Sequence, residues 1–307
     1  MLKKKGFFHE IFKNKVLYLM LVPTLLYFFV MSYLPMAGVY LAFTRFNFRQ
    51  GFFGSPFVGF ENFRFLFMSG TIFNITKNTI LFNLVFIFLG NFLAIICAIF
   101  INELPGRLFK KMSQSVMFLP YFISFVIVGA FVYNIFGFET GALNTLLKSL
   151  QLQPFDAYST VWIWKYILVI FYMWKNLGYM SVIYLAAITG ISEEYYEAAT
   201  IDGANIFQQI RNITVPLLAP TFITLVLLSL GGIMRGQFDL FYQIVGTNGL
   251  LFNSTDIIDT YVFRSLKESF DIGLGTAAGL YQSFFGCIII VTVNYIIRKK
   301  NSDYALF

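Results

Sequence analysis

Six windows of about 20 apolar residues limit the fold of this 307-residue chain more than any other feature. They lie near 16–42, 79–101, 115–138, 166–190, 216–236 and 272–297. A helix of that length crosses roughly 30 Å of hydrocarbon. Lipid offers the backbone no hydrogen-bond partner, so each window must satisfy its own N–H and C=O groups. Only 12% of the residues are charged, against about 25% in soluble domains. We therefore predict an all-α polytopic membrane protein with six transmembrane helices.

The basic residues predict how these helices are oriented. Clusters precede the first window, separate the second from the third and follow the last: Lys3, Lys4, Lys5, Lys13, Lys15, Arg107, Lys110, Lys111, Arg298, Lys299 and Lys300. Because cytoplasmic loops carry an excess of Lys and Arg, we expect both termini in the cytoplasm. Loops 43–78, 139–165 and 237–271 then face outward, and the polar third loop is a candidate docking surface for an extracytoplasmic protein. Lipid headgroups and this topology account for the net charge of +7, so no nucleic-acid partner is expected.

These observations predict one membrane domain, residues 16–297, between short cytoplasmic tails, 1–15 and 298–307. Within that domain a polar, partly acidic segment, residues 191–216, separates the fourth window from the fifth. Ser192 is a candidate N-cap, and the two glutamates after it suit the first turn of a helix. Asp202-Gly203 permits a break, and a second short apolar face follows. We expect two short cytoplasmic helices hinged at Gly203.

The same segment resembles the signature loop of the membrane subunits of ATP-binding-cassette importers. The matching residues are Glu197, Ala198, Ala199, Gly203, Ile213, Val215 and Pro216, with Val215 in place of the usual Leu. The resemblance implies that the loop, residues 191–215, carries a cytoplasmic coupling helix between helices four and five. Its implied contacts to an ATPase, over 192–214, are Glu197, Ala198, Ala199, Asp202, Gly203, Ile213 and Pro216. An ordinary amphipathic linker is the alternative.

The resemblance extends over nearly the whole chain and implies an assembly in a bacterial cell membrane. Its other members would be a second homologous permease, expected to be a different chain, two ATPase subunits that use ATP and Mg, and an extracytoplasmic solute-binding protein. The segment Val58–Phe63 is similar to an amphipathic stretch of sugar-importer permeases, and the ending RKKNSDYALF is similar to tails of the polysaccharide and complex-carbohydrate branch. A carbohydrate is therefore the implied substrate, and this chain itself is expected to bind no cofactor.

Lys175 lies inside the fourth window, where an intramembrane charge costs about 2.5–3.5 kcal/mol on insertion scales. Trp174, Asn176 and Tyr179 surround it, and aromatic faces beside amide and ammonium groups suit a sugar. The resemblance places the stretch from Trp174 to Tyr179 on the transport path of maltose-type permeases. The alternative is a lysine that snorkels or pairs with a carboxylate of the partner permease.

A second set of candidate path residues lies near the end of the fifth window. The resemblance aligns Ser229, Ile233 and Gly236 with polar sugar contacts of maltose-type permeases, but only Ser229 is polar here. This departure argues against maltose and directs attention to Arg235, Gln237 and Asp239. Lys175 and Arg235 together would favour an acidic or heavily hydroxylated oligosaccharide. An Arg235–Asp239 pair at i, i+4 of one helix explains the arginine equally well.

Residues for catalysis are scarce. His9 lies in the lysine-rich amino-terminal segment, Cys97 and Cys287 lie inside apolar windows, and no Walker A sequence is present. The glycine-rich run 273–279 opens a window without a preceding strand, so Gly275 and Gly279 are expected to permit close helix packing rather than to bind a nucleotide. The resulting prediction is a non-enzymatic permease subunit of an importer of oligosaccharides or complex carbohydrates. A non-sugar solute, or an ion-coupled secondary transporter, remains the alternative.

Overall fold

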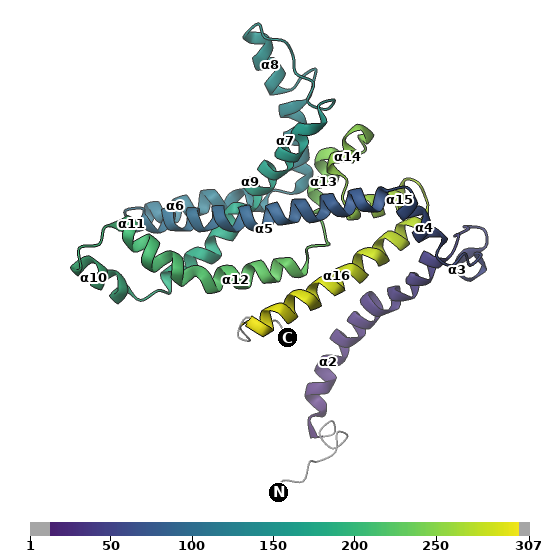
Figure 1. Cartoon of the computed structure of the whole chain (residues 1–307), viewed down its shortest axis with the longest axis horizontal. Coiled ribbons are helices and arrows are strands. Elements are labelled where there is room, and N and C mark those ends of the chain that lie inside the picture. The colour runs from purple at the N-terminus through teal and green to yellow at the C-terminus, as the bar shows by residue number, and fades with distance from the viewer. Residues whose placement is uncertain (1–12, 301–307) are drawn as a thin grey trace.

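The structure, a computed structural model, describes residues 13–300 (Figure 1). Features expected of residues 1–12 and 301–307, among them His9 and the first lysine cluster, lie outside the described residues. Over residues 13–300 the chain forms helices and a single isolated bridge, Thr44 to Phe57, and contains no β-strand. The all-α prediction is confirmed.

Five helical runs within residues 13–300 are long and apolar enough to cross a membrane, and a bent pair raises the number to six. The first is α2 (Lys15–Phe28), continued by η1 (Phe29–Tyr33) and η2 (Leu34–Phe43). The others are α5 (Thr71–Glu103), α9 (Trp164–Thr189, after η4, Val161–Ile163), α12 (Val215–Gly231, after α11, Ile206–Gln209, and η5, Ile210–Thr214) and α16 (Ile272–Lys300). Helix α12 ends five residues before the predicted window 216–236 does.

The third predicted span, 115–138, is not a straight helix. It is divided between α6 (Arg107–Phe118) with η3 (Leu119–Phe122) and α7 (Phe125–Phe136), and the two parts are bent by 92°. Pro120 lies in the first turn of η3, Ile123 and Ser124 are extended, and the Ser124 side chain accepts a hydrogen bond from the N–H of Ile127. A proline turn followed by a fresh N-cap ends one helix and starts another.

Helix α5 is the centre of the bundle, because it contributes to all three apolar clusters. Phe82 and Phe86 pack with α7, α9 and α13 (Phe238–Val245), and Ile72 and Ile75 pack with η2, α15 (Ile258–Lys267) and α16. Further along, Ala94 packs with α9 and α12. Helix α2 stands apart in Figure 1, and none of its residues is buried.

The outward-facing loops of the prediction are themselves helical. They contain α3 (Gly51–Gly54), α4 (Glu61–Met68), α8 (Ala142–Ser149), α13, η6 (Gly249–Leu251), α14 (Phe252–Thr255) and α15. The third loop was expected to be a polar docking surface, but Ser254, Thr255 and Asp256 are buried. Asn78 of α5 holds this loop by donating to the carbonyls of Asn253 and Asp256. Much of its polarity therefore binds the protein itself.

The segment 191–216 lies at the other end of the molecule. Figure 1 shows α10 (Glu193–Ile201) and α11 at one end of α5, and α4 and α15 at its opposite end. The candidate coupling segment and the loops predicted to face outward therefore lie at opposite ends of α5.

Candidate coupling surface and translocation path

The predicted hinge is present as a capped helix-turn-helix. The Ser192 side chain accepts from the N–H of Glu194 (3.4 Å), and α10 then runs to Ile201. The N–H of Gly203 donates to the carbonyl of Thr200 (3.0 Å) and that of Ala204 to Ala199 (2.9 Å). These two bonds form a Schellman motif, which needs a left-handed residue at its fifth position. Gly203 has φ +78°, so it is the residue that permits the turn.

Side-chain hydrogen bonds fix α10 to the start of the next span. Tyr196 and Thr214 share a hydrogen bond through their hydroxyl groups (2.9 Å), and Gln209 donates to Thr200 Oγ1 (3.0 Å). Asn205 and Gln208 form a capping box at the start of α11. Because α11, η5 and α12 form one continuous run, these bonds join α10 to the span itself.

The outer surface of this unit is both acidic and apolar. Glu193, Glu194 and Glu197 are exposed, as are Ala198, Asp202 and Pro216, while Ala199 and Ile213 are partly buried. Ile201 is 86% exposed and Phe207 79%. Apolar side chains that stand out from a polar rim in this way are typical of protein interaction sites.

Lys175 binds the bend of the third span. Its Nζ donates to the carbonyl of Tyr121 (2.6 Å) and to that of Ile123 (2.5 Å), and it lies 4.9 Å from the centre of the Phe125 ring. The side chain is only 7% exposed. Within residues 13–300 its charge meets no carboxylate, because the two ion pairs there are Arg45–Glu61 and Arg264–Asp256. The sequence had suggested a sugar or a partner carboxylate; the contact found is with carbonyls that the bend leaves without helical partners.

Gly178 and Tyr179, close to Lys175 on α9, complete this junction. We call it the α6–α9 clasp: Lys175, Gly178 and Tyr179 on one side, and η3 with the end of α6 on the other. The Tyr179 ring stacks on that of Tyr121 with centroids 4.6 Å apart. Gly178 lets the backbone of α6 approach so closely that a Cβ there would lie 1.9 Å from the carbonyl oxygen of Met117. Lys175 and Tyr179 therefore share the face of α9 that packs on the bend.

The remaining candidates of the first set point elsewhere. Trp174 is 39% exposed and contacts Phe131 and Phe171 by ring edges. Asn176 donates to the carbonyl of Tyr172 one turn back in its own helix, and Ser229 of α12 does the same to Leu225. No hydrogen bond or ion pair within residues 13–300 joins the clasp to Arg235.

After Ser229 in α12, the rest of the second set lies in or just after a break of the backbone, residues 232–237, between α12 and α13. Arg235 is exposed within the break, Gln237 is the residue before α13, and Asp239 lies in the first turn of α13. The i, i+4 pairing of Arg235 with Asp239 is wrong, since the two do not share a helix and form no ion pair in the described part of the chain. Three residues that the sequence analysis did not select hold this region, namely Asn83, Asp259 and Gln282. A fourth unselected residue, Gly178, belongs to the clasp.

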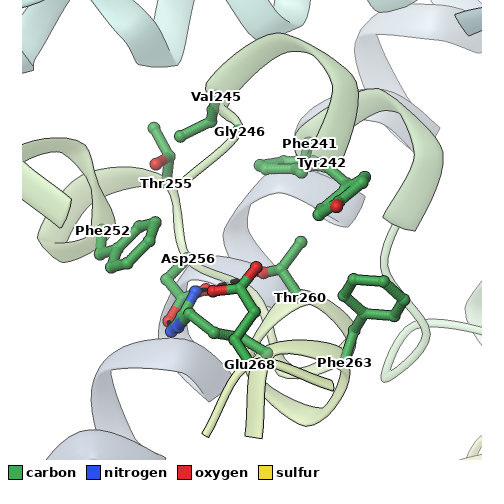
Figure 2. Close-up of a pocket in the computed structure, with 11 residues that line it drawn as sticks. Phe241, Tyr242, Val245, Gly246, Phe252, Thr255, Asp256, Thr260, Phe263 and Glu268 are labelled. Carbon is green, nitrogen blue, oxygen red and sulfur yellow. Dashed lines mark hydrogen bonds and ion pairs between the residues drawn. The ribbon is translucent and has the colours of Figure 1, made fainter. Parts of the chain in front are cut away.

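The small cavity beside Arg264 and Asp256 is too small for a carbohydrate. Arg264 donates from both terminal nitrogens to the Asp256 carboxylate (3.2 and 2.6 Å), Thr260 donates to the same carboxylate (2.7 Å), and the guanidinium lies 3.9 Å from the centre of the Phe252 ring. Figure 2 shows Phe252, Asp256 and Glu268 around the space that remains. That space is about 10 Å³, room for one water at most. The ion pair joins α14 to α15 and is structural.

Comparison with known proteins identifies the family. A model described as the binding-protein-dependent transport system inner membrane component matches residues 90–302. The chain belongs to this family. It is a membrane permease subunit of an ATP-binding-cassette importer and not itself an enzyme.

Individual relatives match the permease over nearly its full length. Protein LplB of Bacillus subtilis is 34% identical over 95% of this chain and 91% of its own. The polygalacturonan/rhamnogalacturonan transport system permease protein YteP of the same organism is 29% identical over 98% and 93%. Among solved structures, a chain of a bacterial ABC transporter involved in the import of the acidic polysaccharide alginate superposes with a TM-score of 0.85, at 30% identity, over 96% of this chain and 99% of that one. The permease fold thus extends over nearly the whole chain.

Proposed function

We propose that this permease forms half of the translocation path of an ATP-driven importer of oligosaccharides or complex carbohydrates. The observation that carries the proposal is the α10–Gly203–α11 unit, hydrogen-bonded to the start of α12 and exposing Ile201 and Phe207 at the end of the molecule away from the outer loops. The functions of two similar proteins, polygalacturonan or rhamnogalacturonan transport and alginate import, support a carbohydrate as the substrate.

In this proposal residues 192–214 couple the spans to a cytoplasmic ATPase. Ile201 and Phe207 enter an apolar cleft of the ATPase subunit, and Glu197 and the exposed acidic residues beside it face its basic rim. Closure of an ATPase dimer, with ATP and Mg bound there, moves α10; its hydrogen bonds to Gln209 and Thr214 pass the movement to α12. The spans then rock between two states whose populations ATP shifts.

The proposed path residues divide into two groups. Trp174, Lys175, Asn176 and Tyr179 on α9 form one wall, in which Lys175 fixes the bend and the exposed parts of Trp174 and Tyr179 offer stacking surface. Ser229, Arg235, Gln237 and Asp239 form the other, at the end of α12. Sugar rings stack on aromatic faces while polar groups bind their hydroxyls.

The proposed assembly has a second homologous permease, two ATPase subunits and an extracytoplasmic solute-binding protein. A periplasmic binding protein is present in the solved alginate transporter complex, which supports that partner here. Both termini are proposed to lie in the cytoplasm, with the outer loops facing the binding protein.

A pair of matched substitutions tests the coupling surface. Phe207→Ser should reduce co-purification of the ATPase with the permease and reduce ATP-driven uptake, because it removes the most exposed aromatic ring of the unit. Phe53→Ser is the control, since Phe53 is 89% exposed on α3 among the outer loops. Normal ATPase co-purification and uptake with Phe207→Ser would contradict the proposal. Identifying the proteins and sugars that co-purify with the wild-type permease tests the partners and the substrate class.

A further inference from the structure

The break at residues 232–237 is held rigidly by three other helices. Asn83 of α5 donates to two of its carbonyls, those of Ile233 and Arg235 (both 2.8 Å). Gln282 of α16 donates to the carbonyl of Met234 (2.7 Å). The N–H of Gly236 donates to Asp259 Oδ2 of α15 (2.7 Å), and a Cβ on this glycine would lie 2.3 Å from Ile257 Cδ1. The backbone that carries Arg235 is therefore fixed in place.

The Arg235 side chain, in contrast, has no partner in the described part of the chain. Its guanidinium makes no hydrogen bond or ion pair within residues 13–300. Arg235 interacts electrostatically with the Asp259 carboxylate but does not bind it. Oδ2 of Asp259 already accepts from the N–H of Gly236 and from Gln282 Nε2 (3.0 Å). The five N–H donors of the side chain thus remain free on an arginine whose backbone is fixed.

These donors open into a groove between the end of α12 and α16. The groove has a volume of about 420 Å³ and is lined by Gly231, Gly232, Arg235, Gln282, Ser283 and Gly286, among others. This volume lies within the range of about 300–1,000 Å³ that small-ligand sites occupy. The glycines keep the groove open, and a charged group placed beside membrane spans must face water or a ligand rather than lipid.

The groove also offers acceptors next to the guanidinium. Gln282 uses its Nε2 for Met234 and Asp259, which leaves its carbonyl oxygen available. The Ser283 hydroxyl donates to the carbonyl of Gly279, which leaves its oxygen lone pairs. A ligand that matches the groove therefore carries one carboxylate and several hydroxyl donors close together, as a sugar acid does.

Resting on the proposed function, we propose that Arg235 binds the carboxylate of uronate units and makes this permease selective for acidic oligosaccharides. A guanidinium and a carboxylate form two parallel hydrogen bonds, while Gln282 and Ser283 accept from the ring hydroxyls. We do not assign this charge recognition to Lys175, because its side chain is buried and two of its three N–H donors bind the carbonyls of the bend.

The test uses the complete transporter, purified from its native membrane and placed in proteoliposomes with its binding protein and ATP. The probes are oligogalacturonate and oligoalginate, each beside its methyl ester, which removes the charge and keeps the sugar, together with neutral oligosaccharides. Arg235→Gln should lower the ratio of acid to ester uptake about tenfold, which corresponds to about 1.4 kcal/mol. Arg49→Gln, an exposed arginine of the outer loop, should keep the wild-type ratio.

Several results would overturn the inference. They are an unchanged ratio with Arg235→Gln, an equal loss of acid and ester uptake, or an effect that disappears in vesicles without anionic lipid. If the wild-type transporter takes up neutral sugars but no acidic ones, the inference is refuted while the proposed function stands. If it takes up no carbohydrate at all, both the inference and the proposed function are refuted. If the Arg235→Gln complex fails to assemble, Arg235→Lys replaces it, because lysine keeps the charge. This variant should retain at least about a third of the preference for acid over ester. An assembled Arg235→Lys complex without that preference refutes the inference.

Discussion

Replacing Gly178 by alanine should disrupt the α6–α9 clasp. An added Cβ would lie 1.9 Å from the carbonyl oxygen of Met117, 2.5 Å from its carbon and 2.9 Å from the Cα of Phe118. All three atoms belong to the backbone, so no rotamer change can relieve the contact. Since a carbon and a carbonyl oxygen approach to about 3.3 Å, α6 must move away from α9 by more than an ångström. The Lys175 hydrogen bonds at 2.6 and 2.5 Å would then be stretched beyond bonding distance.

The expected cost combines two effects. Overpacking a close contact costs about 1–3 kcal/mol, and each hydrogen bond of a charged group contributes about 1.5–3 kcal/mol. The free energy of unfolding should therefore fall by about 3 kcal/mol or more. At about 2 °C per kcal/mol, this lowers the thermal midpoint by at least about 6 °C. The assay is the thermal midpoint of the detergent-solubilised permease complex, followed by size-exclusion chromatography after heating.

Gly279→Ala is the matched control. The expectation that Gly279 permits close helix packing is wrong within this chain, because a Cβ there meets nothing within 4 Å, whereas one on Gly275 would lie 2.8 Å from Leu266. Alanine at 279, within α16, should therefore leave the midpoint equal or slightly higher. A wild-type midpoint for Gly178→Ala, or an equal loss in both variants, would show that the close approach of α6 to α9 does not stabilise the protein.

Three further predictions concern other parts of the molecule. Lys175→Met leaves two carbonyls unpaired, which costs about 1–3 kcal/mol each, but it also removes a buried charge that costs about 2.5–3.5 kcal/mol. Because these effects offset each other, the complex should stay assembled in detergent while uptake falls. Wild-type uptake would contradict this. Gly203→Ala forces an L-residue to φ +78°, which costs about 1–2 kcal/mol, and should lower uptake per ATP hydrolysed. Gly190→Ala, at φ −86°, should not lower it. Equal effects of the two substitutions would contradict a role of the turn in coupling. Asn253→Cys, exposed, should react with an impermeant thiol reagent from outside much faster than Ser254→Cys, which is 8% exposed; no reaction at residue 253 would reverse the proposed topology.

The sequence sufficed for features that depend on neighbouring residues. Long apolar windows located the spans, and the N-cap Ser192 and the glycine at 203 located the helix-turn-helix, because hydropathy and capping act within a few residues. The bend of the third span was missed, since Pro120 alone is compatible with a kinked continuous helix. What fixes the bend is Lys175, 54 positions away from Tyr121.

The break after α12 could have been anticipated in part. Gly231, Gly232 and Gly236 lie within six residues, and glycine disfavours the interior of a helix. Treating this stretch as continuous helix produced the incorrect Arg235–Asp239 pair. The residues that hold the break, Asn83 and Gln282, come from distant helices, and only their polarity inside apolar windows pointed to a role.

Both interruptions follow one physical rule, and it separates structural polar residues from candidate substrate contacts. A helix that breaks within a membrane protein frees backbone groups that lipid cannot satisfy. Lys175 binds such carbonyls at the first break, and Asn83, Gln282 and Asp259 bind the second. Once these groups are assigned to the backbone, the intramembrane lysine no longer needs a ligand to explain it. Arg235 remains the candidate substrate contact, because this network holds its backbone while its guanidinium makes no hydrogen bond or ion pair within residues 13–300.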